Sequence, residues 1–197
     1  ATAFMTALSA GFLMWYPSFL IRIHQFPISE AGYAFGLVFL CFGTLGVIFG
    51  GFFASLLTAK RVYGGNMLVI ATAATLCFFP YLLAPQASSV NTSLVLVGVA
   101  IFFTQMIAGV CVAAIQLITP NQMRGQASAI FLFSVNCIGF GLGPSLVAIF
   151  NDFIFSHSEA LANSLTSTAL CIAPVCIAWY WKSLSAYQRE YSVFQGH

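Results

Sequence analysis

Charged residues are scarce in this chain of 197 residues. Six Lys and Arg and four Asp and Glu make up only 5% of the sequence, whereas a soluble domain usually carries about 25%. Hydrophobic residues account for 60%, and 21 of the residues are phenylalanine. So little charge beside so much apolar surface excludes an ordinary soluble domain and indicates a protein that lies in a lipid bilayer.

The chain also lacks the groups on which catalysis and metal binding depend. The six cysteines lie singly in apolar stretches without a CxxC pair, so neither a zinc site nor a disulfide framework is indicated. His24 and His157 stand alone, and no acidic residue lies deep in an apolar stretch. Without a nucleophile beside a base or a pair of acids, we expect no enzyme activity. We also expect no metal and no cofactor.

Six long apolar stretches fill most of the sequence, and short polar breaks separate them. Each meets or approaches the length of about 20 residues that a helix needs to cross the hydrocarbon layer. We therefore predict an all-α membrane protein, a six-transmembrane-helix bundle over residues 1–184, followed by a cytoplasmic tail over 185–197. The predicted helices cover residues 1–23, 30–57, 66–84, 94–118, 125–150 and 161–184.

The basic residues predict how the bundle is oriented. Cytoplasmic breaks are enriched in Lys and Arg, and only Arg22 falls on the other side. The remaining five lie on alternate breaks or after the last stretch, at Lys60, Arg61, Arg124, Lys182 and Arg189. We expect both ends of the segment to be cytoplasmic, in a multi-pass protein of a plasma membrane or a bacterial inner membrane. The basic residues form no patch with interleaved aromatics, so we expect no nucleic-acid partner.

A polar stripe runs along the first predicted helix. Thr2, Thr6, Ser9 and Tyr16 follow one another at spacings of four, three and seven residues, which places them on one helix face. Such side chains can serve as hydrogen bonds between helices or line a wet central cavity. Pro17 lies directly after Tyr16 and bends the helix, which favours the cavity. Thr6, Ser9 and Tyr16 are therefore candidate substrate-binding residues.

Two amides inside later stretches are further candidates. Gln105 lies on a face of small residues in the fourth stretch, and Asn136 lies near the middle of the fifth. A buried amide in lipid must find a partner, because an unsatisfied polar group there costs several kcal/mol. That partner can be a neighbouring helix or a ligand, and the sequence leaves both open for Gln105 and Asn136.

Glycines at small-xxx-small spacing predict places where helix backbones pack closely. Gly46 and Gly50 belong to such a run in the second stretch, and Gly139 and Gly143 to another in the fifth. Pro144 follows directly and removes a backbone donor, which predicts a kink there. These residues are expected to serve in helix packing or gating.

Several motifs resemble the major facilitator superfamily of transporters, and in particular its Spinster-like group. The segments that carry the resemblance are Trp15-Tyr-Pro-Ser-Phe-Leu20, Ser29-Glu-Ala-Gly32, Thr119-Pro-Asn-Gln-Met-Arg-Gly-Gln-Ala-Ser-Ala129 and Gly139-Phe-Gly-Leu-Gly-Pro144. The loop signature of the family appears as Gly51, Ser55, Lys60 and Arg61, with serine in place of its aspartate. The resemblance runs nearly end to end and identifies the chain as similar to the C-terminal half of such a transporter.

The resemblance implies one six-helix half of a twelve-helix carrier with a substrate site between its two halves. The chain begins at Ala1 inside an apolar stretch, so we expect a piece of a longer protein. Its expected partners are the bilayer, an N-terminal six-helix half of the same chain, and a small organic or amphiphilic solute, lipid-like solutes included. The expected function is secondary active transport by alternating access, with Lys60, Arg61 and Arg124 on the cytoplasmic loops.

Two other kinds of protein also fit the sequence. The first is a complete six-helix protein that forms a homodimeric carrier or channel through its glycine faces. The second is a membrane scaffold that transports nothing, in which the amides only join helices. A dimer would be detected by crosslinking at native expression, and a reconstituted transport signal would exclude the scaffold.

Overall fold

The structure, a computed structural model, describes residues 1–60, 64–155 and 161–195. Over these residues the chain is helical and contains no strand. Six long helices follow one another: α1 (Thr2–Ile23), α2 (Ile28–Ala59), α3 (Gly65–Leu83), α4 (Val90–Ile118), α5 (Arg124–Ile149) and α6 (Leu161–Gln195). Each of the six contains a span long and apolar enough to cross a membrane. The predicted all-α membrane fold is therefore confirmed.

Three short helical segments flank the long helices. They are the 3-10 helices η1 (Ala84–Gln86) and η2 (Asn121–Met123) and the π-helical η3 (Phe150–Phe155). The fifth predicted helix ends at residue 150, whereas in the structure η3 continues α5 to Phe155. The predicted tail begins at residue 185, and in the structure α6 extends through it as a helix to Gln195. The apolar span ends at Leu184, but no glycine or proline lies between it and Gln195, so nothing in that segment breaks the helix.

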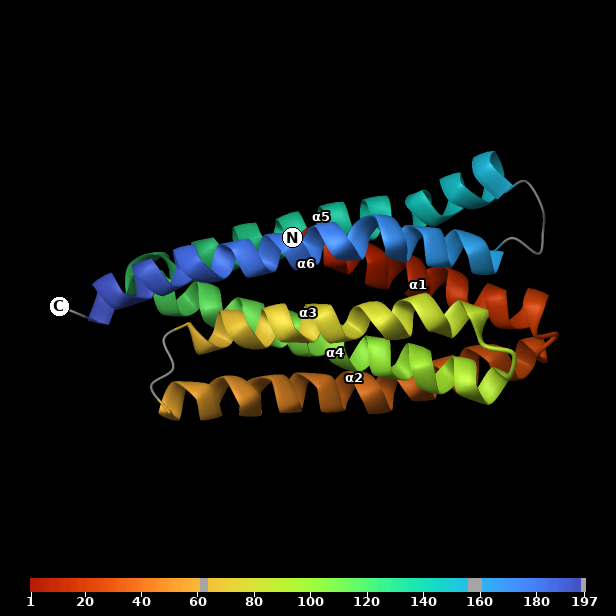
Figure 1. The fold of residues 1–197 in the computed structure, drawn as a ribbon, viewed down its shortest axis with the longest axis horizontal. Coiled ribbons are helices and arrows are strands. Elements are labelled where there is room, and N and C mark those ends of the chain that lie inside the picture. The colour runs from red at the N-terminus through yellow and green to blue at the C-terminus, as the bar shows by residue number, and fades with distance from the viewer. Residues whose placement is uncertain (61–63, 156–160, 196–197) are drawn as a thin grey trace.

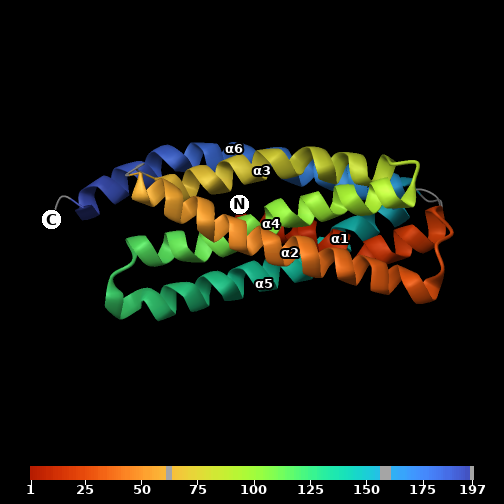
Figure 2. The same ribbon diagram turned by 90° about the horizontal axis from the view of Figure 1, so that it is seen from below.

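The helices run up and down along one long bundle (Figure 1). α2 ends and α5 begins at one end of the bundle, while α1 and α3 end at the other. Helix α1 packs mainly on α5, α2 mainly on α4, and α3 on both α4 and α6. Figure 2 shows α5 along one side of the bundle and α3 with α6 along the opposite side.

Close backbone contacts join α2 to α4. A Cβ atom on Gly46 would overlap the main-chain carbonyl of Phe102, and one on Gly50 would lie 2.9 Å from the carbonyl of Met106. The contact is reciprocal, because a Cβ on Gly98 of α4 would lie 2.8 Å from the ring of Phe42. Only glycine permits this approach of the two helices.

Helices α1 and α5 approach each other equally closely. A Cβ on Gly143 would overlap the carbonyl of Ala7, and one on Gly139 would lie 2.6 Å from the methyl group of Thr6. Gly11 of α1 would in turn place a Cβ 3.0 Å from the Gly143 carbonyl. The glycines that the sequence assigned to packing therefore lie at the crossings of α1 with α5 and of α2 with α4.

The outer helices α2 and α5 bury little of their surface. Within the most apolar 18-residue window of each helix, 22% of α2 and 17% of α5 is buried, against 50% for α1, α3 and α4. Both exposed faces carry large apolar side chains, such as Leu40 on α2 and Phe133 on α5. Most of the surface of these two helices is therefore available to lipid or to another protein segment.

The packing at Gly46 can be tested against a matched glycine on the same helix. We expect Gly46→Ala to destabilise the protein by about 1 to 3 kcal/mol, because the added methyl group meets the backbone of α4. Gly51→Ala is the control, since a Cβ there has no atom within 4 Å. The measurement is the apparent melting temperature of the purified full-length protein. Equal melting temperatures for the two variants would contradict the packing described above.

Candidate functional site

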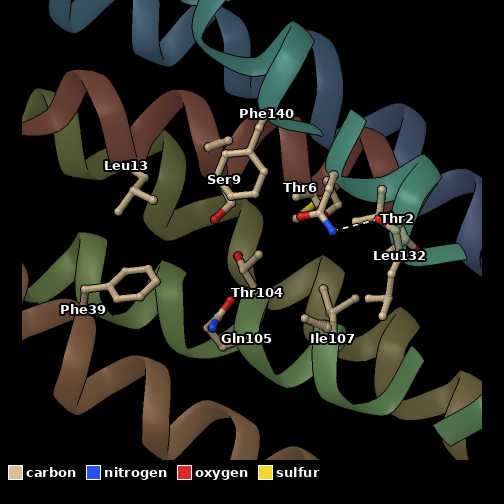
Figure 3. Close-up of a pocket in the computed structure, with 15 residues that line it drawn as sticks. Thr2, Thr6, Ser9, Leu13, Phe39, Thr104, Gln105, Ile107, Leu132 and Phe140 are labelled. Carbon is tan, nitrogen blue, oxygen red and sulfur yellow. Dashed lines mark hydrogen bonds between the residues drawn. The ribbon is translucent and has the colours of Figure 1, made fainter. Parts of the chain in front are cut away.

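A cavity lies near the middle of the bundle, between the pair α1 and α5 and the pair α2 and α4. Its volume is about 220 Å³, and residues from these four helices line it (Figure 3). Figure 3 shows Leu13 and Phe39 toward one end, Thr2 and Leu132 toward the other, and Ser9, Thr104 and Phe140 between them. The polar side chains of the wall are Thr2, Thr6, Ser9, Thr104, Gln105 and Asn136. No charged residue lines the cavity within the part of the chain that the structure describes.

Four of the five candidate substrate-binding residues come together here. Thr6 and Ser9 reach the cavity from α1, Gln105 from α4 and Asn136 from α5. They lie far apart in the sequence, and the two glycine-mediated helix pairs bring them to one place. Gly139, by contacting Thr6, also fixes where that threonine enters the wall. Contact of these residues with a substrate stays a prediction.

The two amides of the wall differ in their hydrogen bonding. The Asn136 amide nitrogen donates one of its two N–H groups to the carbonyl of Leu132, 2.8 Å away in the same helix, so its second N–H and its oxygen are left for other partners. The Gln105 amide has no hydrogen-bond partner among the described residues, and its side chain is only partly buried. Gln105 therefore offers both a donor and an acceptor at the cavity surface.

Buried hydrogen bonds hold Thr104, one of the residues that line the cavity, in place. The Thr104 hydroxyl donates to the carbonyl of Ala100 at 2.9 Å. Its single proton is used there, so the hydroxyl of Tyr81, 3.0 Å away, must be the donor of the bond between them. Thr104 thus presents only a lone pair to the cavity. Thr104 was not among the candidate residues, because it lies in α4 and not in the polar stripe of the first helix. Its position directly before Gln105 could have suggested it.

Tyr16 lies outside the cavity, although it shares the polar stripe of α1. Its side chain is fully buried, and its hydroxyl lies 2.6 Å from the Ser93 hydroxyl and 3.0 Å from the Ser93 carbonyl. Ser93 gives its own proton to the carbonyl of Ala84, so Tyr16 is the donor. The rings of Phe12, Phe19 and Phe35 lie around it. Tyr16 therefore joins α1 to the start of α4 and is not part of the cavity wall, and its contact with a substrate stays a prediction.

Other residues that the sequence singled out lie inside α5 and at one end of the bundle. Pro144 is inside α5, and the Trp15 indole donates to its carbonyl at 3.0 Å. Lys60 directly follows α2. Arg124 begins α5 and donates to the carbonyl of Thr119 at 3.1 Å, which holds the connection between α4 and α5. Arg61 lies outside the described residues.

The chain is similar to known proteins both in sequence and in fold. No protein-family model matches the chain. The chain is 26% identical over 191 residues to an MFS-type efflux pump of Mycolicibacterium smegmatis, covering 96% of the chain and 44% of the pump. The abbreviation MFS stands for the major facilitator superfamily.

The likeness also extends to solved structures. A crystal structure of a bacterial homolog of the human lysosomal transporter Spinster, inward-facing and occupied, matches 97% of this chain and 47% of that one, with a TM-score of 0.67 and 17% identity. The unoccupied inward-facing structure matches with a TM-score of 0.64 and 18% identity, over 99% of this chain and 47% of that one.

The class of protein follows from these matches. Over nearly its whole length the chain has the fold of about half of that Spinster homolog, and its six apolar helices indicate an integral, multi-pass membrane protein. The similarity to an MFS-type pump in sequence and to the Spinster homolog in fold confirms the resemblance seen in the sequence motifs. The chain spans about half the length of the relatives that it matches.

The structural role of Tyr16 can be separated from a role in binding. Tyr16→Phe removes one buried hydrogen bond, so we expect a loss of about 0.5 to 1.5 kcal/mol in stability and no change in apparent substrate affinity. Tyr33→Phe is the control, since that side chain is 75% exposed. The measurements are the melting temperature and the concentration dependence of transport. A raised half-saturation concentration at unchanged stability would instead indicate that Tyr16 contacts the substrate.

Proposed function

We propose that this chain is the C-terminal half of a twelve-helix secondary active transporter of the major facilitator type. One observation carries the proposal: the cavity between the pairs α1 with α5 and α2 with α4, whose wall is polar at several points and apolar elsewhere. A wall of this kind suits a small organic or amphiphilic solute, lipid-like solutes included. The matched proteins are a pump and a transporter homolog, which favours transport over enzyme activity.

The weakly buried faces of α2 and α5 support the same proposal. A second bundle packed on these helices would cover their surface. The cavity would then lie between the two bundles, and each bundle would supply one of its walls. Alternating access would then follow from rocking of one bundle against the other around the shared site. The missing N-terminal half would supply the second bundle and any acidic residue that couples transport to an ion.

The orientation follows from the basic residues that the structure places near one end. Lys60 directly follows α2 and Arg124 begins α5, and these two helix ends lie on the same side of the bundle (Figure 1). Since cytoplasmic loops are enriched in Lys and Arg, we propose that this end faces the cytoplasm. The end of α6 lies on the same side and would then be cytoplasmic, whereas α1 begins nearer the middle of the bundle (Figure 1).

The existence of a second bundle can be tested by measuring the mass of the native polypeptide. An antibody against residues 185–197 would recover the protein from its source membrane for mass spectrometry. We expect a mass about twice that of these 197 residues, because a twelve-helix carrier needs two six-helix halves. A mass equal to that of the 197 residues would instead favour a homodimer, which crosslinking at native expression would then detect.

The role of the cavity wall can be tested at Gln105. We expect Gln105→Leu to lower transport by about tenfold or more at equal membrane abundance, because a wall amide that bonds a ligand contributes on the order of 1.4 kcal/mol or more. The assay is the rate at which cells that produce the full-length protein expel a fluorescent amphiphilic dye.

The control is the same substitution at Gln116. That glutamine lies on the same helix, is exposed, and bonds to Ser128 at 3.3 Å, away from the cavity. We expect Gln116→Leu to transport at nearly the unmodified rate. Unchanged transport in the Gln105 variant, with the unmodified protein active, would remove Gln105 from the site.

A further inference from the structure

Helix α2 contributes little side chain to the cavity. Among the lining residues that the structure describes, only Phe39 comes from this helix. Gly43 lies one turn further along α2 and on the same face, because residues four apart are neighbours on a helix surface, and it is buried. A glycine there has no side chain to place in the wall, so another helix supplies what lies against it.

The side chain of Gln105 lies against Gly43. A Cβ atom on Gly43 would lie 3.7 Å from the Gln105 Cγ and 4.0 Å from its amide nitrogen. On the next turn of α2, a Cβ on Gly46 would lie 3.1 Å from the Gln105 Cβ. The Gln105 side chain therefore runs over two glycines of α2, with its amide beside Gly43. Figure 3 shows Gln105 between Phe39 and Ile107 along one side of the cavity.

Packing alone holds this amide in place. The Gln105 amide has no hydrogen-bond partner among the described residues, and the side chain of a glutamine can turn about several single bonds. The helix that carries it cannot move away, because close backbone contacts at Gly46 and Gly50 join α4 to α2. The surface of α2 at Gly43 therefore decides how far from the cavity the amide can lie.

The space at Gly43 is about as large as one methyl group. A methyl group there would be in ordinary van der Waals contact with Gln105, since its nearest neighbour would be 3.7 Å away. A branched side chain needs more room and would overlap the place where the amide now lies. Because no hydrogen bond holds the amide, it is the group that would move. Gln105 lines the cavity, so movement away from α2 takes up space inside it.

We propose that Gly43 is a specificity-determining residue, which sets the width of the solute that the cavity accepts by leaving room for the Gln105 amide against α2. Gly43 acts through Gln105 and has no need to touch the solute itself. A larger side chain at this position would push the amide into a cavity of about 220 Å³ and exclude wide solutes. This inference rests on the proposed function, since it concerns the selectivity of the same cavity.

The first experiment compares two neutral dyes that share a boron-dipyrromethene core and a hydroxyl group. One carries methyl groups on the core, and the other carries phenyl groups and is wider. Cells that produce the full-length protein are loaded with each dye, and export is measured at equal membrane abundance. We expect Gly43→Val to slow the wide dye by at least about tenfold and the narrow dye by less than about twofold, because the displaced amide takes space that only the wide dye needs. Equal slowing of both dyes, or unchanged export of the wide dye, would overturn the proposal.

Two matched variants on α2 serve as controls. Gly43→Ala adds a methyl group that fits without displacing Gln105, and Gly51→Val makes the larger change where a Cβ has no atom within 4 Å. We expect both variants to export the two dyes at nearly the unmodified rates. Equal effects of Gly43→Val and Gly51→Val would mean that added bulk on α2, and not the position of the amide, limits export, which would also overturn the proposal.

The second experiment tests whether Gly43 acts through Gln105. Gln105→Asn keeps the amide and shortens the side chain by one methylene group, so the double variant Gly43→Val with Gln105→Asn has room for both side chains. We expect the double variant to export the wide dye at least about fivefold faster than Gly43→Val alone. A general loss of packing at Gly43 would not be repaired in this way. Losses that simply add in the double variant would contradict an action through Gln105.

If Gly43→Val fails to fold, Gln105→Asn alone still decides the proposal. The shorter side chain leaves the cavity wider at this place, so export of the wide dye relative to the narrow dye should rise by about twofold or more. An unchanged ratio would overturn the proposal.

Failure of this inference is distinguishable from failure of the proposed function. A protein that exports both dyes without any effect of width in these variants retains the proposed function and loses only this inference. An unmodified protein that exports neither dye would contradict the proposed function, and this inference would fall with it.

Discussion

The close approach of helix backbones at glycine is the constraint on which this bundle depends. In a membrane there is no hydrophobic force between helices, because lipid tails are as apolar as the side chains. Helix association then relies on van der Waals contact, and that contact is greatest where a missing Cβ lets two backbones meet. Gly143 against Ala7 and Gly46 against Phe102 are such places. They join α1 to α5 and α2 to α4 as two closely fitted pairs.

The cavity is a consequence of this pairing. Small residues face each other within each pair, whereas Thr6, Ser9, Thr104 and Gln105 face the space between the pairs. Toward the ends of α1 and α3 that space is filled by aromatic rings, with the centroids of Phe12 and Tyr81 4.6 Å apart. The bond from Tyr16 to Ser93 holds α1 on α4 in the same region. Tyr16 therefore serves the cavity by fixing the helices around it.

The sequence predicts most of the fold because membrane spans are long and apolar. The predicted limits of α1, α3 and α5 differ from the structure by at most two residues. The start of α4 was placed four residues late, because the polar residues Asn91, Thr92 and Ser93 looked like a break. Ser89 in fact caps the helix by accepting a bond from the Thr92 amide at 3.2 Å, and Ser93 is held by Tyr16. The hydropathy of the sequence predicts where the membrane-spanning helices lie, but it does not predict the residues that cap their ends.

The site was harder to predict than the fold, because residues on the same face of a helix can have different neighbours at different points along its length. Thr6, Ser9 and Tyr16 share a stripe, yet seven residues separate Ser9 from Tyr16, a rise of about 10 Å along the helix. Over that distance the neighbours of α1 change from the cavity to the start of α4. Thr104 was missed because its role depends on the proton that it gives to Ala100. Such a role is visible only once α3 and α4 are placed side by side.

The polar atoms left over in the wall restrict what can lie on its open side. The Gln105 amide has no partner among the described residues, and the Asn136 oxygen is left over after its nitrogen bonds to Leu132. Against lipid tails each such group would cost several kcal/mol, and the glycine contacts that fix α4 and α5 prevent either helix from turning it away. The open side of the cavity must therefore meet water, a ligand or polar protein surface. Lipid tails do not satisfy these groups, whereas the second bundle proposed above would enclose them in a shared wet cavity.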